Sequence, residues 1–164
     1  MESEGITVFE IPDIYTLISG TSEGTSKLGA FDNAILNAGV GNTNLIKLSS
    51  ILPPGASFQN RIVYPRGVLV PIAYGSISSD VKGEMIAASV AIAISADDGF
   101  GVIMEYSGIT SAEEVEKTAR KMAEDAMKHR NVKIKELKSL SSEHIVVNFG
   151  CAFAAVPMWY LNLL

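Results

Sequence analysis

The sequence predicts one α+β domain with more strand than helix. Its 164 residues suit a single compact domain with a buried core. Short segments rich in β-branched residues dominate the chain, whereas one long segment has the apolar spacing of an amphipathic helix. No internal repeat, low-complexity tract or long linker divides the sequence. Strands that outnumber a segregated helix are typical of α+β architecture.

Eight segments have the length and composition of β-strands. In chain order they are Ile6–Ile11, Tyr15–Ser19, Asn44–Ser50, Val68–Ser78, Glu84–Ser95, Phe100–Tyr106, Val132–Leu140 and His144–Phe153. Between the fifth and the sixth, Asp97-Asp98-Gly99 predicts a hairpin turn, because glycine adopts the positive φ that such turns need. We therefore expect these two strands to be neighbours in a sheet.

Two helices are expected. Residues Phe31–Ala38 predict a short helix closed by Gly39, with Asp32 as a candidate N-cap. Ser111 and Glu114 form a capping box that begins a longer helix, which runs to about residue 130. Its expected sheet-facing residues are Val115, Ala119, Met122 and Ala126. Its expected outer ion pairs are Glu113–Lys117, Glu116–Arg120 and Glu124–Lys128.

Composition and charge exclude several classes of function. The net charge is −5 and no basic stripe is present, so we expect no nucleic-acid partner. The apolar runs Ile86–Ala88 and Val90–Ile94 are too short to span a bilayer. The apolar tail Cys151–Leu164 is interrupted by Pro157 and Asn162, so we expect no membrane association. Cys151 is the only cysteine, and the first residues are acidic rather than basic. A cytoplasmic location is therefore expected.

The common catalytic motifs are absent from the sequence. It has no Walker A loop, no HExxH and no CxxC. His129 near a helix end and His144 in a strand favour structural roles, and Cys151 favours a small buried side chain. Gly39-Val40-Gly41 lacks the strand–loop–helix setting of a dinucleotide site. No metal site is expected.

A pair of serines stands in an unusual place. Ser49 and Ser50 end a predicted strand, two residues before Pro53-Pro54. Pro53 restricts Leu52 to extended conformations, and neither proline has an N–H to donate. The simplest interpretation of the pair alone is a strand end with two small polar residues.

Four further segments give the serine pair another meaning. They are Ala30–Gly39 (AFDNAILNAG), Val70–Gly75 (VPIAYG), Ile103–Tyr106 (IMEY) and Gly150–Ala155 (GCAFAA). Together with Ser49-Ser50, they resemble the archaeal-type pyruvoyl-dependent arginine decarboxylases. The resemblance covers nearly the whole chain in order, but it does not extend to residues 54–66 or 162–164.

The resemblance implies a fold, an assembly and a cofactor. The fold is a layered α/β/β/α sandwich of mainly antiparallel sheets flanked by helices. The assembly is a homotrimer of cleaved protomers with active sites at the subunit interfaces. Self-cleavage between Ser49 and Ser50 is expected to give residues 1–49 (the β chain) and 50–164 (the α chain). Ser50 would become a covalent pyruvoyl group, with neither a metal nor pyridoxal phosphate required.

The resemblance also assigns roles to single residues. The hydroxyl of Ser50 is the nucleophile of cleavage, and Asn44 is a hydrogen-bond donor in cleavage and catalysis. Glu105 is the proton donor, although an exposed glutamate at a strand edge is an equally simple interpretation of it. Asp32 faces the guanidinium of arginine, and Ile35 and Ser49 complete the substrate site. The implied reaction converts L-arginine to agmatine and CO2, as a step in polyamine biosynthesis.

Two alternatives stay open. One is the same pyruvoyl chemistry on lysine, ornithine or histidine; aspartate is disfavoured because Asp32 would repel it. The other is an inactive relative that acts as a binding or regulatory subunit. The joint presence of Asn44, Ser50 and Glu105 argues against the second.

Overall fold

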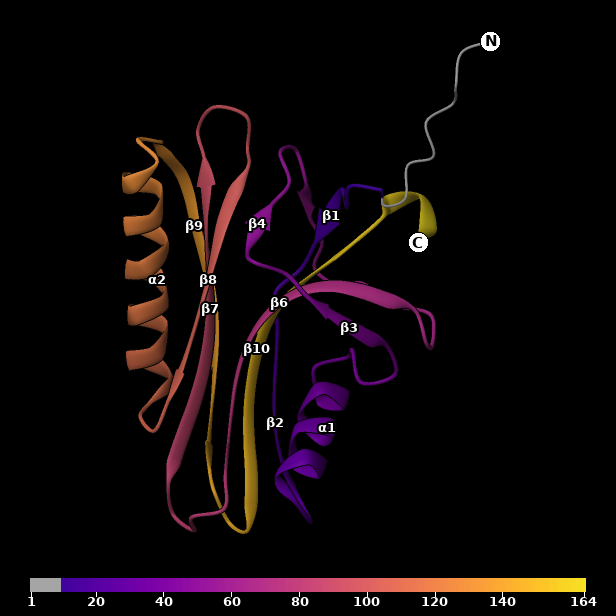
Figure 1. The fold of residues 1–164 in the computed structure, drawn as a ribbon, viewed down its shortest axis with the longest axis vertical. Coiled ribbons are helices and arrows are strands. Elements are labelled where there is room, and N and C mark those ends of the chain that lie inside the picture. The colour runs from indigo at the N-terminus through magenta and orange to yellow at the C-terminus, as the bar shows by residue number, and fades with distance from the viewer. Residues whose placement is uncertain (1–9) are drawn as a thin grey trace.

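Two β-sheets lie face to face, and one helix covers the outer face of each (Figure 1). This computed structural model describes residues 10–164. The predicted α/β/β/α sandwich is confirmed. The predicted strand Ile6–Ile11 lies largely outside the described residues, and its last two residues are not in a strand.

The first sheet is built around strand β10, which is central and almost wholly buried. Its strands are β1 (Ile14–Tyr15), β2 (Ile18–Gly24), β3 (Asn44–Lys47), β5 (Ser57–Phe58), β6 (Leu69–Ser79) and β10 (Phe149–Trp159). β10 pairs antiparallel with β1, β2 and β6. The two short outer pairs, β3 with β6 and β1 with β5, are parallel.

The second sheet is antiparallel, in the order β4-β8-β7-β9. Its strands are β4 (Ile51–Leu52), β7 (Met85–Ser95), β8 (Gly101–Gly108) and β9 (Ile134–Ile145). The predicted hairpin joins β7 to β8 and is confirmed. Gly99 has a φ of +77°, and the carboxylate of Asp98 accepts a hydrogen bond from the backbone N–H of Phe100.

The helices begin at serine caps. Ser111 accepts a hydrogen bond from the N–H of Glu114 and begins α2 (Ala112–His129), as predicted. α1 (Lys27–Asn37) begins earlier than predicted, because Ser26 is its N-cap and accepts from the N–H of Gly29. The prediction that Asp32 is the N-cap is therefore wrong, and Asp32 lies in the helix interior. A short 3-10 helix, η1 (Leu161–Leu163), follows β10.

Neither α1 nor α2 has the combination of length and apolar character that crossing a membrane requires, nor does any other helix within residues 10–164.

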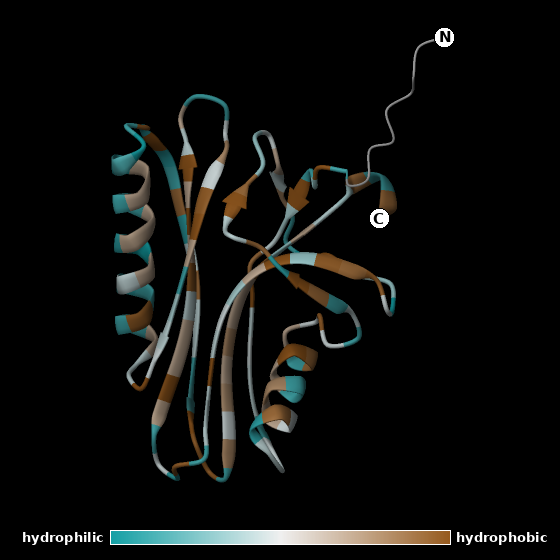
Figure 2. Ribbon diagram, in the orientation of Figure 1, coloured by the Kyte–Doolittle hydropathy of each residue, from teal (hydrophilic) through white to brown (hydrophobic). Residues whose placement is uncertain are grey.

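Alternation along β10 explains two of the three layers of core. Ala152, Ala154 and Val156 face the second sheet, whereas Cys151, Phe153 and Ala155 face α1. A strand buried on both faces needs apolar residues at every position, which accounts for the uninterrupted apolar run in the sequence. The third layer packs Ala119, Ala123 and Met127 of α2 against the second sheet. Figure 2 shows the hydrophilic residues of α2 on the side away from that sheet.

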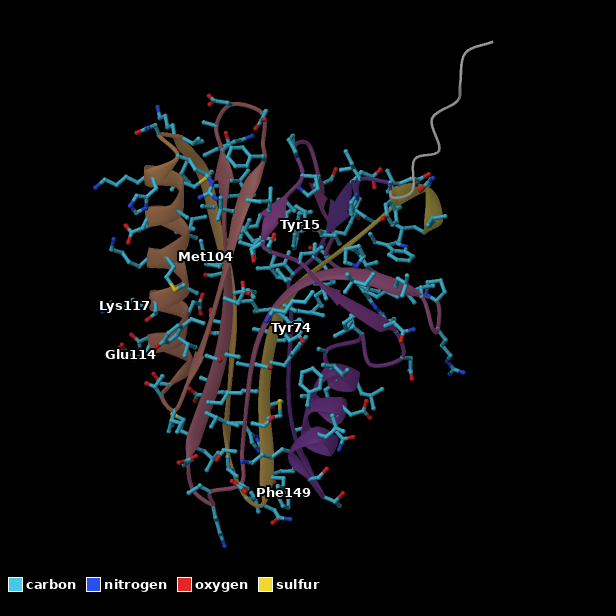
Figure 3. All side chains as sticks on the ribbon, viewed as in Figure 1. Tyr15, Tyr74, Met104, Glu114, Lys117 and Phe149 are labelled. Carbon is cyan, nitrogen blue, oxygen red and sulfur yellow. The ribbon has the colours of Figure 1, made fainter. Side chains whose placement is uncertain are left out.

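The predicted faces of α2 need two corrections. Met122 is 36% exposed rather than in the core. Within residues 10–164, the three predicted i,i+4 ion pairs do not form, and the pair on this helix is Lys121–Asp125. The carboxylate of Glu116 instead accepts hydrogen bonds from Ser139 and Ser141 of β9. Figure 3 shows Glu114 and Lys117 on the outer side of α2 and Met104 between the helix and the sheet.

The predicted break between the last two strands is also wrong. β9 continues through the polar run Ser141-Ser142-Glu143, and β10 begins only at Phe149. The polar run stays in the strand because its hydroxyl groups have partners. Ser141 donates to Glu116 of α2, and Ser142 donates to the carbonyl oxygen of Phe153 in β10.

Glu23 ties the end of β2 to the turn between β9 and β10. Its carboxylate lies 2.6 Å from Nε2 of His144 and accepts hydrogen bonds from the N–H groups of Val147 and Asn148. Desolvation raises the pKa of Glu23, but these three hydrogen bonds outweigh it and lower the pKa to about 2. His144 therefore has the structural role that the sequence favoured.

The lowered pKa of Glu23 predicts an acid-dependent loss of stability. A carboxylate with a depressed folded-state pKa stabilises the fold fully above its unfolded pKa, about 4.3. That contribution is lost as the pH falls toward about 2. We expect Glu23→Gln to lower the free energy of unfolding at pH 7 by about 1–2 kcal/mol. The variant should also show a shallower decline in the free energy of unfolding between about pH 4.5 and pH 2.

Urea denaturation of the wild type and the variant at pH 7, 4, 3 and 2 measures both effects. Glu124→Gln, on the exposed face of α2, is the control for loss of one carboxylate. If the free energy of unfolding falls equally with decreasing pH in the wild type and in Glu23→Gln, Glu23 is not the source of the acid-dependent loss of stability.

Candidate active site

The chain passes from one sheet to the other at the serine pair. β3 belongs to the first sheet, and the N–H of Leu48 still bonds to the carbonyl oxygen of Ile72 in β6 at 2.9 Å. Ile51 then pairs with Val102 in the second sheet. Ser49 and Ser50 are the two residues between these anchor points. The predicted strand Asn44–Ser50 therefore ends early, at Lys47.

The backbone of Ser50 is held in an uncommon conformation. Its φ is +86°, and within residues 10–164 the only other non-glycine residue with a positive φ is Asn131. A left-handed conformation costs an L-residue about 1–3 kcal/mol, so the surroundings must enforce it. The carbonyl oxygen of Ser50 accepts a hydrogen bond from the N–H of Ile103 at 2.9 Å, which fixes the residue against β8.

Glu105 meets the side chain of Ser50 from β8. The hydroxyl of Ser50 donates to Oε2 of Glu105, at an Oγ–Oε2 distance of 3.2 Å. Side chains alternate along a strand, so Glu105 projects on the same face as the fully buried Ile103, toward the first sheet. Glu105 is half-buried. The alternative interpretation, an exposed glutamate at a strand edge, is therefore wrong in its exposure, although β4 pairs only with Gly101 and Val102 of β8 and leaves Glu105 at an edge of the described sheet.

A glycine in the opposite sheet makes room for Glu105. A Cβ built on Gly75 of β6 would lie 3.2 Å from the Cβ of Glu105 and 3.4 Å from the carbonyl oxygen of Ser89. Contacts this short require the neighbours to shift. Gly75 belongs to the VPIAYG segment, but the sequence alone gave it no role, because its partner lies in the other sheet.

A cavity of about 260 Å³ opens beside the serine pair. Its lining residues are Ser49, Ser50, Ile51, Val102, Met104, Glu105, Met122 and Arg130. Met122 and Arg130 of the α2 region were not recognised from the sequence as parts of a site. The only signal for Met122 was its helical spacing, which favoured the core. The cavity combines apolar walls with one carboxylate and one guanidinium.

Asp32 and Ile35 lie together on α1, away from this cavity. They line a shallow depression of about 530 Å³ with Leu28 and Phe31, among others. Asp32 is exposed and makes no hydrogen bond or ion pair with residues 10–164, whereas Ile35 is largely buried against the first sheet. α1 covers the outer face of the first sheet, and β4 lies in the other sheet (Figure 1).

Asn44 is also absent from the lining of the Ser50 cavity. Its side-chain amide donates to the carbonyl oxygen of Gly67 at 2.9 Å, at the start of β3. One chain thus brings Ser49, Ser50 and Glu105 together and leaves Asn44, Asp32 and Ile35 elsewhere. Within residues 10–164, no group of three or more His, Cys, Asp or Glu side chains is placed to hold a metal ion.

Comparisons with known proteins point to a single family. A family model described as pyruvoyl-dependent arginine decarboxylase matches residues 14–162. A curated protein of that name from Methanocaldococcus jannaschii is 48% identical over 153 residues, which cover 93% of each chain. A protein of the same name from a Methanococcus maripaludis strain is 45% identical over 153 residues, which also cover 93% of each chain. One from Pyrococcus abyssi is 40% identical over 146 residues, which cover 87% of this chain and 92% of the relative.

Proposed function

Since the chain belongs to the pyruvoyl-dependent arginine decarboxylase family, we propose that it cuts itself between Ser49 and Ser50 and then decarboxylates L-arginine. The observation that carries the proposal is the contact between the Ser50 hydroxyl and Glu105, at a residue whose backbone is strained. A positioned hydroxyl is the group that self-cleavage needs. The products of the decarboxylation are agmatine and CO2.

The proposed cut conserves every atom. Ser50 Oγ attacks the carbonyl carbon of Ser49, an ester replaces the amide, and the nitrogen of Ser50 becomes a free amine. Loss of the Cα proton of residue 50 then expels the carboxylate of Ser49 and leaves dehydroalanine. Hydrolysis consumes one water, releases ammonia and leaves a pyruvoyl group at the start of residues 50–164. Relief of the strain at Ser50 favours the first step.

The surroundings of Ser50 fit a pyruvoyl group derived from it. Ser50 lines a cavity with room for a substrate amine, and part of the cavity wall is apolar. The pyruvoyl ketone supplies an acceptor for the electrons released when CO2 leaves. Glu105 lies within reach of that position and is the proposed donor of the proton that replaces CO2.

We further propose that the substrate site is completed by a second copy of the chain. Asp32 and Ile35 line a separate depression, and Asn44 points to Gly67. In a homotrimer, one protomer could present these three residues to Ser50 of its neighbour. The substrate site would then contain residues from two protomers. Asp32 suits the guanidinium of arginine, because a carboxylate and a guanidinium pair through two parallel hydrogen bonds.

Asp32→Asn tests the choice of substrate. The change keeps the side chain's size but removes the charge, and a charge-assisted pair is worth about 1.5–3 kcal/mol. We expect kcat/KM for arginine to fall by roughly one to two powers of ten. The ratio of kcat/KM for arginine to that for lysine or ornithine should decrease, while self-cleavage should proceed normally.

Initial rates of CO2 release from arginine, lysine and ornithine measure this effect. Asp97→Asn, in the exposed β7–β8 turn, is the matched control. Unchanged arginine kinetics in Asp32→Asn would remove Asp32 from the substrate site. A wild-type protein that cuts itself but prefers lysine or ornithine would retain the cofactor chemistry and overturn arginine as the substrate.

A further inference from the structure

The two sheets approach each other closely where Gly75 of β6 faces β8. A Cβ built on Gly75 would lie 3.2 Å from the Cβ of Glu105, which is short for two aliphatic carbons. It would also lie 3.4 Å from the carbonyl oxygen of Ser89 and 3.6 Å from the backbone nitrogen of Tyr106. These neighbours are backbone atoms and the first carbon of a side chain, so no flexible side-chain end can move aside. A methyl group here would therefore displace the strand that carries Glu105.

A hydrogen bond between the sheets holds them at this spacing. The hydroxyl of Ser107 in β8 donates to the carbonyl oxygen of Ser76 in β6, at 3.1 Å. Ser76 follows Gly75 directly, and Ser107 lies two residues after Glu105. Hydrogen bonds weaken quickly beyond such distances, so this one resists separation of the strands. Gly75 thus permits the close approach, and the bond from Ser107 maintains it.

Residue 50 is attached to a different part of β8. Its carbonyl oxygen accepts from the N–H of Ile103, and Ile51 pairs with Val102. Both attachments precede Glu105 along the strand. A displacement centred on Glu105 would therefore not carry residue 50 with it, and the distance between them would change. The Oγ–Oε2 distance of 3.2 Å is already at the upper end of the reach for proton transfer, about 2.6–3.2 Å.

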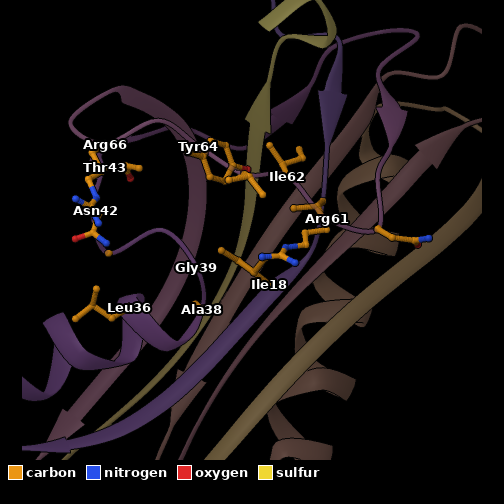
Figure 4. A pocket seen from close by; sticks show the side chains of 14 residues that line it. Ile18, Leu36, Ala38, Gly39, Asn42, Thr43, Arg61, Ile62, Tyr64 and Arg66 are labelled. Atoms are coloured by element: carbon orange, nitrogen blue, oxygen red, sulfur yellow. The ribbon is translucent and has the colours of Figure 1, made fainter. Parts of the chain in front are cut away.

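The space around Glu105 is separate from the depression beside α1. That depression, of about 290 Å³, lies between the end of α1, at Leu36, and residues 60–66 (Figure 4). It shares no lining residue with the cavity at Ser50. Its wall includes Ile18 and Ile62, which pack on the α1 side of the first sheet, whereas Gly75 faces the second sheet. A side chain at residue 75 would contact the Glu105 side and not this depression.

We propose that Gly75 and Ser107 are positioning residues, which set the distance between Glu105 and residue 50 for proton transfer. The inference rests on the proposed role of Glu105 as the proton donor. Neither residue lines the cavity at Ser50, so both act through Glu105. A misplaced proton donor slows the chemical step without weakening the binding of substrate, so the effect belongs in kcat rather than in KM.

Gly75→Ala should lower kcat for CO2 release from arginine by roughly ten-fold. KM should stay within about two-fold of the wild-type value, since the substrate contacts are unchanged. Pyruvoyl groups are counted with a hydrazine reagent, and kcat is expressed per pyruvoyl group. Incomplete self-cleavage in the variant therefore does not affect the comparison.

Gly150→Ala is the matched control for a methyl group added between the sheets. A Cβ on Gly150 would lie 2.8 Å from Cδ2 of His144 and 3.0 Å from Cγ2 of Val146. Gly150 pairs with Ser79 at the far end of β6, away from the serine pair. We expect this control to lower the thermal midpoint at least as much as Gly75→Ala does, and to keep the wild-type kcat.

Ser107→Ala tests the same spacing without added bulk, so it decides the question if Gly75→Ala does not fold. Loss of the hydroxyl removes the bond to Ser76, and kcat should fall by roughly three-fold or more with KM unchanged. Ser142→Ala is its control, because Ser142 of β9 also donates across the sheets, to the carbonyl oxygen of Phe153 at 3.0 Å. The control should keep the wild-type kcat.

A double variant separates positioning from a general loosening of the fold. If Gly75→Ala acts through Glu105, adding it to Glu105→Gln should lower the residual turnover by only about two-fold or less. A further ten-fold loss would overturn the proposal, and so would a wild-type kcat in Ser107→Ala. Full turnover in Glu105→Gln, or a wild-type protein that releases no CO2 from arginine, would overturn the proposed function and this inference with it. The two failures are therefore distinguishable.

Discussion

Ser50→Ala is expected to leave a full-length chain with no decarboxylase activity. Alanine has no hydroxyl to attack the carbonyl of Ser49, and without that attack no pyruvoyl group can form. The backbone should tolerate the change, because alanine and serine bear a similar cost at the φ of +86°. The side chain loses one hydrogen bond, to Glu105, in a half-buried position. The loss of function should therefore be complete while the fold is kept.

Intact mass spectrometry distinguishes the possible states of the chain. Wild-type protein should contain fragments 1–49 and 50–164, which are 49 and 115 residues long (164 − 49 = 115). The larger fragment should resist N-terminal sequencing and should react with a hydrazine reagent through its ketone. Ser49→Ala is the matched control and should still be cut, because only the carbonyl group of residue 49 takes part. Fragments that persist in Ser50→Ala would mean that another protease makes the cut.

The parts of the fold that depend on local sequence were predictable. The capping box at Ser111 began α2 where expected, and Asp97-Asp98-Gly99 formed the hairpin. These features need only neighbouring residues, through a side-chain cap or a glycine with positive φ. One local feature was missed, the Ser26 cap that begins α1. Other errors occurred where distant partners decide the structure. The polar run at Ser141-Ser142 suggested a break, but α2 and β10 supply its hydrogen bonds and keep it in β9.

The same distinction applies to the candidate site. The serine pair and Glu105 were identified from the sequence by resemblance. The contact between Ser50 and Glu105 depends on the pairing of β4 with β8, which brings together residues 55 positions apart. The space that Gly75 leaves for Glu105 depends on how the two sheets stack. Neither the pairing nor the stacking has a signal in any single segment.

Glu105→Gln is expected to retain self-cleavage and to lose turnover. The amide oxygen of glutamine can still accept the hydrogen bond from the Ser50 hydroxyl, which keeps the nucleophile in position. The proton that leaves Oγ is needed on the nitrogen of the same residue, so the first step of the cut has a short internal route. Decarboxylation, in contrast, needs a proton delivered to carbon, and an amide cannot supply one at neutral pH. We expect turnover to fall by roughly two to four powers of ten.

Two measurements on one preparation test this separation of roles. Gel analysis follows the cut at Ser49–Ser50, and single-turnover CO2 release follows the chemistry. The thermal midpoint of Glu105→Gln should stay close to that of the wild type, since glutamine fills the same space beside Gly75. Full turnover in the variant would remove Glu105 from the decarboxylation. An uncut chain with an intact fold would instead make the carboxylate the base of the cleavage step, as its 3.2 Å contact with the Ser50 hydroxyl also permits. Normal cutting with lost turnover is the result that assigns Glu105 to the proton transfer that follows loss of CO2.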